Sequence, residues 1–256
     1  MNKVWLDGKI HNLSSDELHK LEAAEGVFET LRYRNGSIEY LPEHLQRLHA
    51  GEAALGFSKA QLNYAQLFAD LLNANAPLPE FARVRLLSTK HHTLAKIIPY
   101  TPFAKEDYKN GIDLALASHP SQSESAQIKC NHRQGYLEAF LQAKQRGFAE
   151  CLFIADEKVL ECSMSNVIVC HQKKYFISPK QSARLAGVME QKVLSALGSP
   201  VIEADLSWPL PFDANVYITS SLKGIVPVKS IEQFTFSVDR KSSLYQLIGQ
   251  FWPYKS

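Results

Sequence analysis

The sequence has few cysteines, no long apolar run and almost no excess of charge of either sign. Its four cysteines show no CxxC spacing, which favours reduced, buried thiols over a zinc site or a disulfide framework. The longest apolar runs, such as residues 151–155, are far shorter than the ~20 residues of a membrane-spanning helix. Lys and Arg number 28 against 26 Asp and Glu, so charge gives no reason to expect a nucleic-acid or membrane partner.

Several motifs with known chemistry are also missing from the sequence. It contains no GxxxxGKS/T phosphate loop, no GxGxxG, no HExxH and no GxSxG, which argues against nucleotide kinases, zinc hydrolases and α/β-hydrolases. His91 and His92 are adjacent on a predicted strand and would point to opposite faces, so we expect no metal site there. The amino-terminal MNKVWLDGKIHN lacks the apolar segment of a signal peptide, and we expect a cytoplasmic protein.

What the sequence does contain fits a globular protein of two modest α+β domains. Hydrophobic residues make up 45% of the 256 positions and charged residues 21%, ordinary values for a folded chain. The segment 119–127, HPSQSESAQ, has no large apolar residue and clusters Ser, Pro and Gln. We therefore predict an N-terminal α+β domain over residues 1–118, a linker over 119–127 and a β-rich α/β domain over 128–256.

Two local patterns predict turns and helix starts in the first domain. Asn35-Gly36 separates the strand-like segments 27–33 and 37–41 and suits both positive-φ positions of a type I′ turn, which predicts a hairpin. Ser58 and Gln61, three residues apart, predict a capping box ahead of the next helix.

Five polar features stand where chemistry could occur, and each has an ordinary structural alternative. Glu161 ends a predicted apolar strand, where an acid is costly unless paired; a solvated turn carboxylate is the alternative. Arg47 lies on a predicted amphipathic helix, where a surface arginine is the alternative. Lys129 precedes a helix, residues 187–189 open another with amides that suit an anion, and Thr219-Ser220-Ser221 offer hydroxyls after a strand. Their alternatives are a solvated lysine, a helix start without a ligand and a plain turn.

The order of these features along the chain resembles one family of enzymes. Six segments carry the likeness: GVFETLR at 26–32, HLQRL at 44–48, Lys129 before a helix, ECSMSN at 161–166, LAGVM at 185–189 and TSSLKGIVPV at 219–228. Together they resemble the class IV aminotransferase and aminodeoxychorismate lyase family, from Lys3 to about Ser230. The resemblance implies the two-domain, D-amino-acid-aminotransferase-like fold (fold type IV) and the cofactor pyridoxal 5′-phosphate (PLP).

The resemblance also implies a role for individual residues around the PLP ring. Lys129 matches the lysine that binds the cofactor covalently and later moves a proton. Glu161 matches the carboxylate that faces the pyridine nitrogen and keeps it protonated, which would explain an acid among apolar strands. Leu185 matches the leucine that packs beneath the ring.

A second group of residues matches the seat of the PLP phosphate. Arg47 matches the arginine that binds a phosphate with two hydrogen bonds. The amides of Val188 and Met189 and the hydroxyl of Ser221 complete the seat. Relatives usually carry a basic residue where this chain has Glu190, so we expect the carboxylate of Glu190 to point outward to water.

Candidate substrate contacts come from arginines of the first domain. In the predicted strand 81–89, alternation places Arg83 and Arg85 on one face, where they could clamp a substrate carboxylate. The alternative is an edge strand with a solvated face; relatives carry a carboxylate-recognising arginine at the position of Arg85. Arg32 in GVFETLR is a further candidate.

The chain departs from the family pattern at several positions, and these departures bear on which activity we expect. The tyrosine that many transaminases place five residues after the lysine is Gln134 here, Ile168 replaces an aromatic residue, and Ala24-Glu25 replace a Gly-Asp pair. The absence of that tyrosine, the shorter chain and the lyase-like SLKGIVPV ending favour a 4-amino-4-deoxychorismate lyase, which releases pyruvate and 4-aminobenzoate for folate synthesis. The changes at Ile168, Ala24-Glu25 and Glu190 instead keep a non-catalytic protein open as an alternative. A branched-chain or D-amino-acid aminotransferase and a non-catalytic or repurposed PLP-fold protein are the alternatives. In each enzymatic case the resemblance implies a small-molecule amino substrate and a homodimer.

Overall fold

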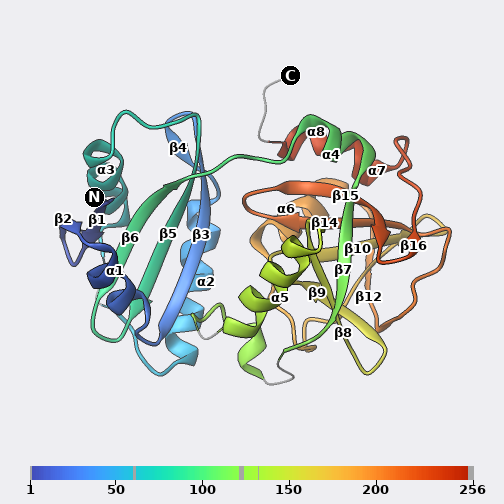
Figure 1. Cartoon of the computed structure of the whole chain (residues 1–256), viewed down its shortest axis with the longest axis horizontal. Helices are drawn as coiled ribbons and strands as arrows, with labels where there is room; N and C mark the ends of the chain where they lie inside the picture. Colours follow the sequence, from blue (N-terminus) through green and yellow to red (C-terminus); the bar gives the residue numbers. More distant parts are fainter. Residues whose placement is uncertain (1, 60–61, 121–123, 132, 253–256) are drawn as a thin grey trace. The chain divides into compact units, whose positions relative to one another are not determined.

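The chain forms two compact units in the computed structural model, which describes residues 2–59, 62–120, 124–131 and 133–252 (Figure 1). The first unit comprises Met1–Pro102 and Ile128–His132, and the second comprises Phe103–Gln127 and Arg133–Ser256. Two units and a mixed α+β content agree with the sequence. No helix within the described ranges is long and apolar enough to cross a lipid bilayer.

The division between the units differs from the predicted boundary near residue 120. Strand β7 (Ile112–Ser118) pairs in parallel with β8 (Glu150–Ala155) and β15 (Gly224–Ile231), which makes it part of the second unit. Glu124–Gln127, from the predicted linker, form a 3-10 turn of that unit, and residues 121–123 lie outside the described residues. The chain then returns to the first unit, where Cys130 bridges to Val27.

The first unit is a six-stranded antiparallel sheet with helices on both faces (Figure 1). Its strands, in spatial order, are β2 (Lys9–Leu13), β1 (Asn2–Leu6), β6 (Thr93–Pro99), β5 (Phe81–Thr89), β3 (Gly26–Arg34) and β4 (Ser37–Ile38). Its helices are α1 (Ser15–Glu22), α2 (Leu41–Ala54) and α3 (Tyr64–Ala74).

Alternation along the strands gives this sheet two different cores. Leu31, Val84 and Leu86 face one side, where they are buried against Leu48 of α2 and other residues of α2 and α3. On the other side, Leu18 of α1 packs on Leu87 and other strand residues. The predicted alternation in β5 is confirmed, but β5 is an interior strand, so the edge-strand alternative is wrong.

The second unit contains a larger mixed sheet (Figure 1). Its path runs β12 (Val201–Glu203), β11 (Lys174–Ile177), β10 (Asn166–His171), β14 (Asn215–Ser220), β15, β7, β8, β9 (Lys158–Cys162) and β13 (Leu206–Ser207), with β16 (Phe234–Thr235) paired to β15. Its α-helices are α4 (Lys105–Asn110), α5 (Gln134–Gln145), α6 (Val188–Leu197), α7 (Ser243–Gln246) and α8 (Ile248–Phe251). Strands β10, β14 and β15 are buried along most of their length, which places the core of the unit there.

Of the two local predictions for the first domain, the hairpin is confirmed and the helix cap is wrong. Asn35 and Gly36 both have positive φ, 46° and 92°, which confirms the type I′ hairpin. The predicted cap at Ser58 is wrong: α3 begins after Asn63, whose side chain accepts a hydrogen bond from the amide of Gln66. Gln61 lies outside the described residues.

Candidate cofactor site

In the first unit, Arg47 is held by a buried carboxylate on the neighbouring strand. Glu29 of β3 is fully buried and accepts hydrogen bonds from Arg47 Nε and Nη2, both at 2.7 Å, and contacts His44 Nδ1 at 2.7 Å. Burial raises the pKa of Glu29, but the charge of Arg47 and hydrogen bonds from Arg47 and His44 outweigh it and lower the value to about 2. Arg47 is therefore no freely solvated surface arginine; Glu29 orients its planar guanidinium.

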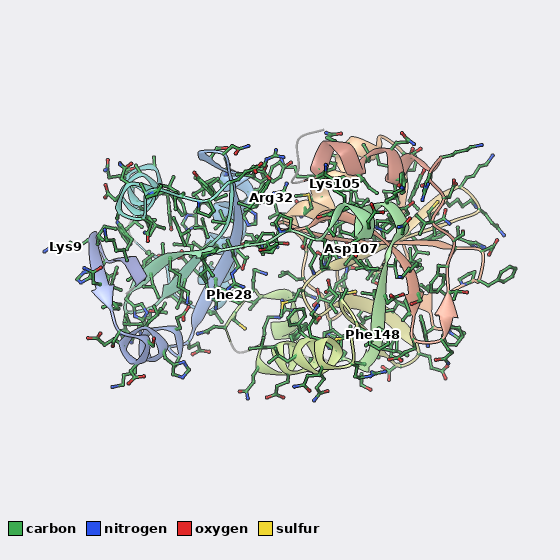
Figure 2. The ribbon with its side chains drawn as sticks, turned by 45° about the horizontal axis from the view of Figure 1, so that its top comes forward. Lys9, Phe28, Arg32, Lys105, Asp107 and Phe148 are labelled. Atoms are coloured by element: carbon green, nitrogen blue, oxygen red, sulfur yellow. The ribbon has the colours of Figure 1, made fainter. Side chains whose placement is uncertain are left out.

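Lys129 is fixed beside the start of β3 by its backbone. Its carbonyl accepts a hydrogen bond from the amide of Phe28 at 2.8 Å, and its Nζ lies 4.9 Å from the centroid of the Phe28 ring. Figure 2 marks Phe28 and Arg32 on β3. Burial lowers the pKa of His44, Glu29 opposes this, and the positive charges of Arg47 and Lys129 add to it. The two predicted cationic residues of this unit are thus close enough to act on one imidazole.

Glu161 in the second unit is a buried, doubly bound carboxylate rather than a solvated turn acid. It lies on β9; its Oε1 accepts from Arg133 Nη2 at 2.7 Å and its Oε2 from the amide of Leu185 at 3.0 Å. The guanidinium of Arg133 lies 3.8 Å from the ring centroid of Tyr136. The structure therefore brings together two predicted residues, Glu161 and Leu185, and adds Arg133, which the sequence reasoning missed.

At the start of α6, the side chain of Asn166 approaches the backbone of Gly187 closely. Gly187 is the N-cap residue of α6 and has no side chain to accept a hydrogen bond from the first amides of the helix. A Cβ atom at residue 187 would lie 1.9 Å from Oδ1 of Asn166, whose Nδ2 donates to the carbonyl of Leu185 at 2.7 Å. The side chains of Val188 and Met189 are buried at this end of the helix.

Glu190 does not point outward, and that expectation is wrong. It is 3% exposed, and both of its carboxylate oxygens lie 2.9 Å from Nη1 of Arg184, itself 2% exposed. Burial raises the pKa of Glu190 although Arg184 opposes it. Arg184, from the preceding loop, thus offsets the cost of burying the Glu190 carboxylate.

A second buried ion pair ties the turn after Ser221 to the loop after Glu161. Lys223 donates to Glu150 and, at 3.1 Å, to Ser165 Oγ. Glu150 is fully buried and also accepts from the amide of Met164 at 2.9 Å and from Ser165 Oγ at 2.8 Å. This network fixes two of the segments that carry the family resemblance.

The three arginines considered for the substrate differ in their surroundings. Arg32 is 1% exposed and forms an ion pair with Glu39 at 2.5 Å. The guanidinium of Arg85 lies 4.0 Å from the Phe28 ring centroid and 3.5 Å from a Glu22 oxygen. Arg83 is exposed on the same face of β5. All three arginines remain candidates for the substrate carboxylate, and Arg32 differs from the other two in being held by a buried ion pair.

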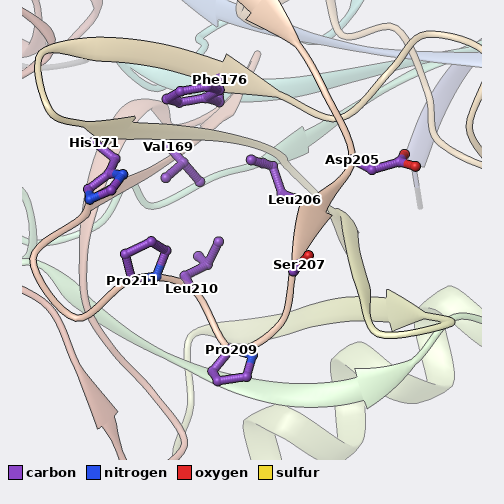
Figure 3. A pocket seen from close by; sticks show the side chains of 9 residues that line it. All are labelled: Val169, His171, Phe176, Asp205, Leu206, Ser207, Pro209, Leu210 and Pro211. Atoms are coloured by element: carbon purple, nitrogen blue, oxygen red, sulfur yellow. The ribbon is translucent and has the colours of Figure 1, made fainter.

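A separate apolar pocket in the second unit contains none of the predicted site residues (Figure 3). Val169, His171 and Phe176 line it from β10 and β11, and the segment from Asp205 to Pro211 lines it from the other side. Its polar side chains, His171, Asp205 and Ser207, are not among those predicted to bind the phosphate.

Most of the residues that sequence reasoning missed carried a visible signal. Glu29 and Glu150 are acids on apolar strands, the same signal that singled out Glu161. Arg133 is four residues beyond Lys129, but its partner lies on a different element.

The groups present suit PLP in each unit considered alone. The first unit offers the guanidinium of Arg47, oriented by Glu29, which suits a phosphate. It also offers the amine of Lys129, which suits an aldehyde. The second offers the buried carboxylate of Glu161 and the start of α6, whose backbone amides can bind an anion.

Comparison with known proteins identifies the family of the chain. The family model for amino-transferase class IV matches residues 26–231. A D-alanine aminotransferase of Bacillus licheniformis is 27% identical over 231 residues, 81% of this chain and 79% of that protein. Among solved structures, a PLP-bound hypothetical aminotransferase from Mycobacterium tuberculosis has a TM-score of 0.81 at 18% identity, covering 96% of this chain and 97% of that one.

A second solved structure, provisionally assigned as a 4-amino-4-deoxychorismate lyase, has a TM-score of 0.76 at 24% identity and covers 97% of this chain and 98% of that one. These likenesses show the fold type IV architecture, and the family match extends over most of the sequence. The chain therefore belongs to the class IV aminotransferase family and is a PLP-dependent enzyme.

Proposed function

We propose that the protein is a 4-amino-4-deoxychorismate lyase, which releases pyruvate and 4-aminobenzoate. The observation that carries this proposal is the side chain five residues after Lys129. Gln134 opens α5 and donates to Glu138 at 2.7 Å on the exposed side of the helix, so no phenol stands there. Tyr136 does not replace it, because its hydroxyl lies 2.6 Å from His119 Nε2 and burial raises its pKa to about 12.

Each predicted residue then has a task in the reaction. When bound, PLP supplies a protonated pyridine ring that accepts the electrons released as a proton leaves the substrate carbon bearing the amino group. Lys129 binds the cofactor and moves that proton as general base and acid. Glu161, held by Arg133 and the Leu185 amide, keeps the proton on the pyridine nitrogen. Leu185 packs beneath the ring.

Binding of the phosphate falls to residues that contribute charge or free amides. Arg47, oriented by Glu29, donates two hydrogen bonds to the dianion, and Val188 and Met189 offer the amides of the α6 start. Ser221 adds a hydroxyl, and the Lys223–Glu150 pair positions its turn. Arg83 and Arg85 bind substrate carboxylates.

The decisive experiment is product analysis with 4-amino-4-deoxychorismate and the PLP-loaded protein. Equal amounts of pyruvate and 4-aminobenzoate are expected, and Lys129→Ala should form neither. A protein that binds PLP and leaves this substrate intact would rule the lyase out.

An aminotransferase for D- or branched-chain amino acids is the second candidate. It is supported by the 27% identity to a D-alanine aminotransferase and by Arg83 and Arg85 on one strand face, where they can bind an α-carboxylate. Adding single amino acids separates the two candidates, because only a transaminase half-reaction leaves the amine form of the cofactor with its distinct absorption. A purified protein that stays colourless after PLP is added would instead favour the non-catalytic alternative.

We also propose a cytoplasmic homodimer, from the family resemblance. Light scattering of the purified protein tests the dimer: a mass near twice 28.8 kDa is expected. A mass near 28.8 kDa would contradict it.

A further inference from the structure

Thr219 has a buried hydroxyl that no group in the described part of the chain satisfies. The residue lies on β14 and is fully buried, and its Oγ1 has no hydrogen-bond partner among the described residues. A buried hydroxyl without a partner is costly, and few such groups persist in folded proteins without a ligand or water. Ile218 before it on the strand and Ile225 across it on β15 are apolar and fully buried, whereas Ser220 follows it and Asn166 is paired with it on β10. The unsatisfied hydroxyl calls for an explanation.

The strand register directs this hydroxyl to the start of α6. Thr219 is paired with Asn166 of β10, and residues paired across an antiparallel ladder share one face of the sheet. The side chain of Asn166 contacts the segment before α6: its Nδ2 donates to the Leu185 carbonyl, and its Oδ1 occupies the space beside Gly187. Helix α6 packs on β14 and β15. Thr219 therefore lies on the face that carries the uncapped helix start.

We propose that Thr219 is a further cofactor-binding residue, whose hydroxyl donates a hydrogen bond to the PLP phosphate at the start of α6. The inference rests on the proposed PLP site. Two independent features converge on it, a helix of ten residues without a side-chain cap and an unsatisfied, fully buried donor on the facing strand. Thr219 is distinct from Ser221, which follows the strand.

The test separates the hydroxyl from the shape of the side chain. Thr219→Val keeps the branched shape and removes the donor. Titration of the apoprotein should show Kd for PLP raised about tenfold or more, the usual effect of one lost bond to a charged group. The apoprotein should unfold at the same or a higher temperature, because the unsatisfied group is gone. Thr219→Ser, which retains a hydroxyl, should restore Kd to within about threefold of the parent.

A matched control lies two residues away on the same face of β14. Tyr217 is buried, and its hydroxyl lies 2.6 Å from Ser242 Oγ, so it has a protein partner. Tyr217→Phe should lower the unfolding temperature and leave Kd for PLP unchanged. Thr219→Val should show the reverse: weaker PLP binding and no loss of stability. A threonine with a purely structural role would not produce this result.

Pyridoxal, which lacks the phosphate, identifies the atom contacted. Thr219→Val should bind pyridoxal as the parent does, and inorganic phosphate should compete with PLP less well in the variant. Equal weakening for PLP and pyridoxal would place the hydroxyl on the ring and overturn the inference. An unchanged Kd for PLP would overturn it as well, with the proposed PLP site intact, whereas a parent protein that binds no PLP would refute the proposed site itself.

Discussion

Arg133 and Glu161 form a buried ion pair, with Nη2 and Oε1 2.7 Å apart. Glu161 is 4% exposed and Arg133 14%, and the amide of Leu185 binds the remaining carboxylate oxygen. A buried carboxylate is costly unless paired, so Arg133 allows Glu161 to stay ionised in an apolar setting. The acid that the sequence presents among apolar strands is therefore stabilised from within its own unit.

Replacing Arg133 with methionine should destabilise the apoprotein. The variant leaves the Glu161 carboxylate buried without its cationic partner, which should lower the free energy of unfolding by about 3 kcal/mol. Arg146→Met is the matched control, because Arg146 also pairs with a carboxylate, Glu232 at 2.7 Å, and lies over an aromatic ring, but is 52% exposed. It should cost ~1 kcal/mol or less. Urea unfolding measures both, and equal losses would contradict a buried role for the Arg133–Glu161 pair.

Glu161→Gln should reduce turnover more than cofactor binding. Glutamine keeps the shape but cannot hold a proton on the pyridine nitrogen by charge. A lost charge-assisted hydrogen bond is worth ~1.5–3 kcal/mol, which corresponds to a fall in kcat of about tenfold to a hundredfold. Kd for PLP should change less, because the phosphate contacts remain. Steady-state kinetics and a PLP titration together check this, and parental turnover would return Glu161 to a purely structural role.

Glu29 should make the stability of the protein depend on pH in the acid range. Its pKa falls from 4.5 to about 2 in the folded protein, so its stabilising contribution is present above pH 4.5 and is lost as pH falls towards 2. A shift of this size corresponds to about 3 kcal/mol. Glu29→Gln should remove that part of the acid dependence, measured by urea unfolding from pH 3 to 7. Glu138→Gln, at an exposed position of α5, should keep the parental dependence.

The features that sequence predicted well depend on residues close together in the chain. The Asn35-Gly36 hairpin and the alternation of β5 follow from local turn chemistry and from the period of a strand. The Ser14–Glu17 capping box at the start of α1 is an equally local feature, because its two residues are three positions apart in the sequence. Glu161 and Arg47 were identified because the family motifs contain them.

The features that the sequence did not predict depend on contacts with residues on other elements or in neighbouring loops. β7 belongs to the second unit because its partners, β8 and β15, lie later in the sequence, and no local pattern of β7 specifies parallel pairing. Glu190 was expected to face water because it is charged and opens a helix. It is buried because the chain before Gly187 folds back and brings Arg184 to its carboxylate.

Neutralising Glu190 should destabilise the protein by leaving Arg184 without its counterion. Both side chains are at most 3% exposed, so Glu190→Gln should lower the free energy of unfolding by about 3 kcal/mol. Glu190→Arg would bury two guanidinium groups together and should be worse than Glu190→Gln. Glu203→Gln, which breaks the exposed pair with Lys180, is the control and should cost ~1 kcal/mol or less. A Glu190→Arg protein as stable as the parent would contradict this buried arrangement.

Lys129 should carry the cofactor. The family resemblance assigns Lys129 to the PLP aldehyde, and a lysine amine forms a covalent bond with an aldehyde by acting as the nucleophile. Borohydride reduces the resulting carbon–nitrogen bond to a stable amine, and peptide mapping should then find the pyridoxyl group on Lys129. Lys129→Ala should retain weak PLP binding through Arg47 and the α6 start while losing turnover. A pyridoxyl group found on Lys144 or Lys192 instead would remove Lys129 from the site.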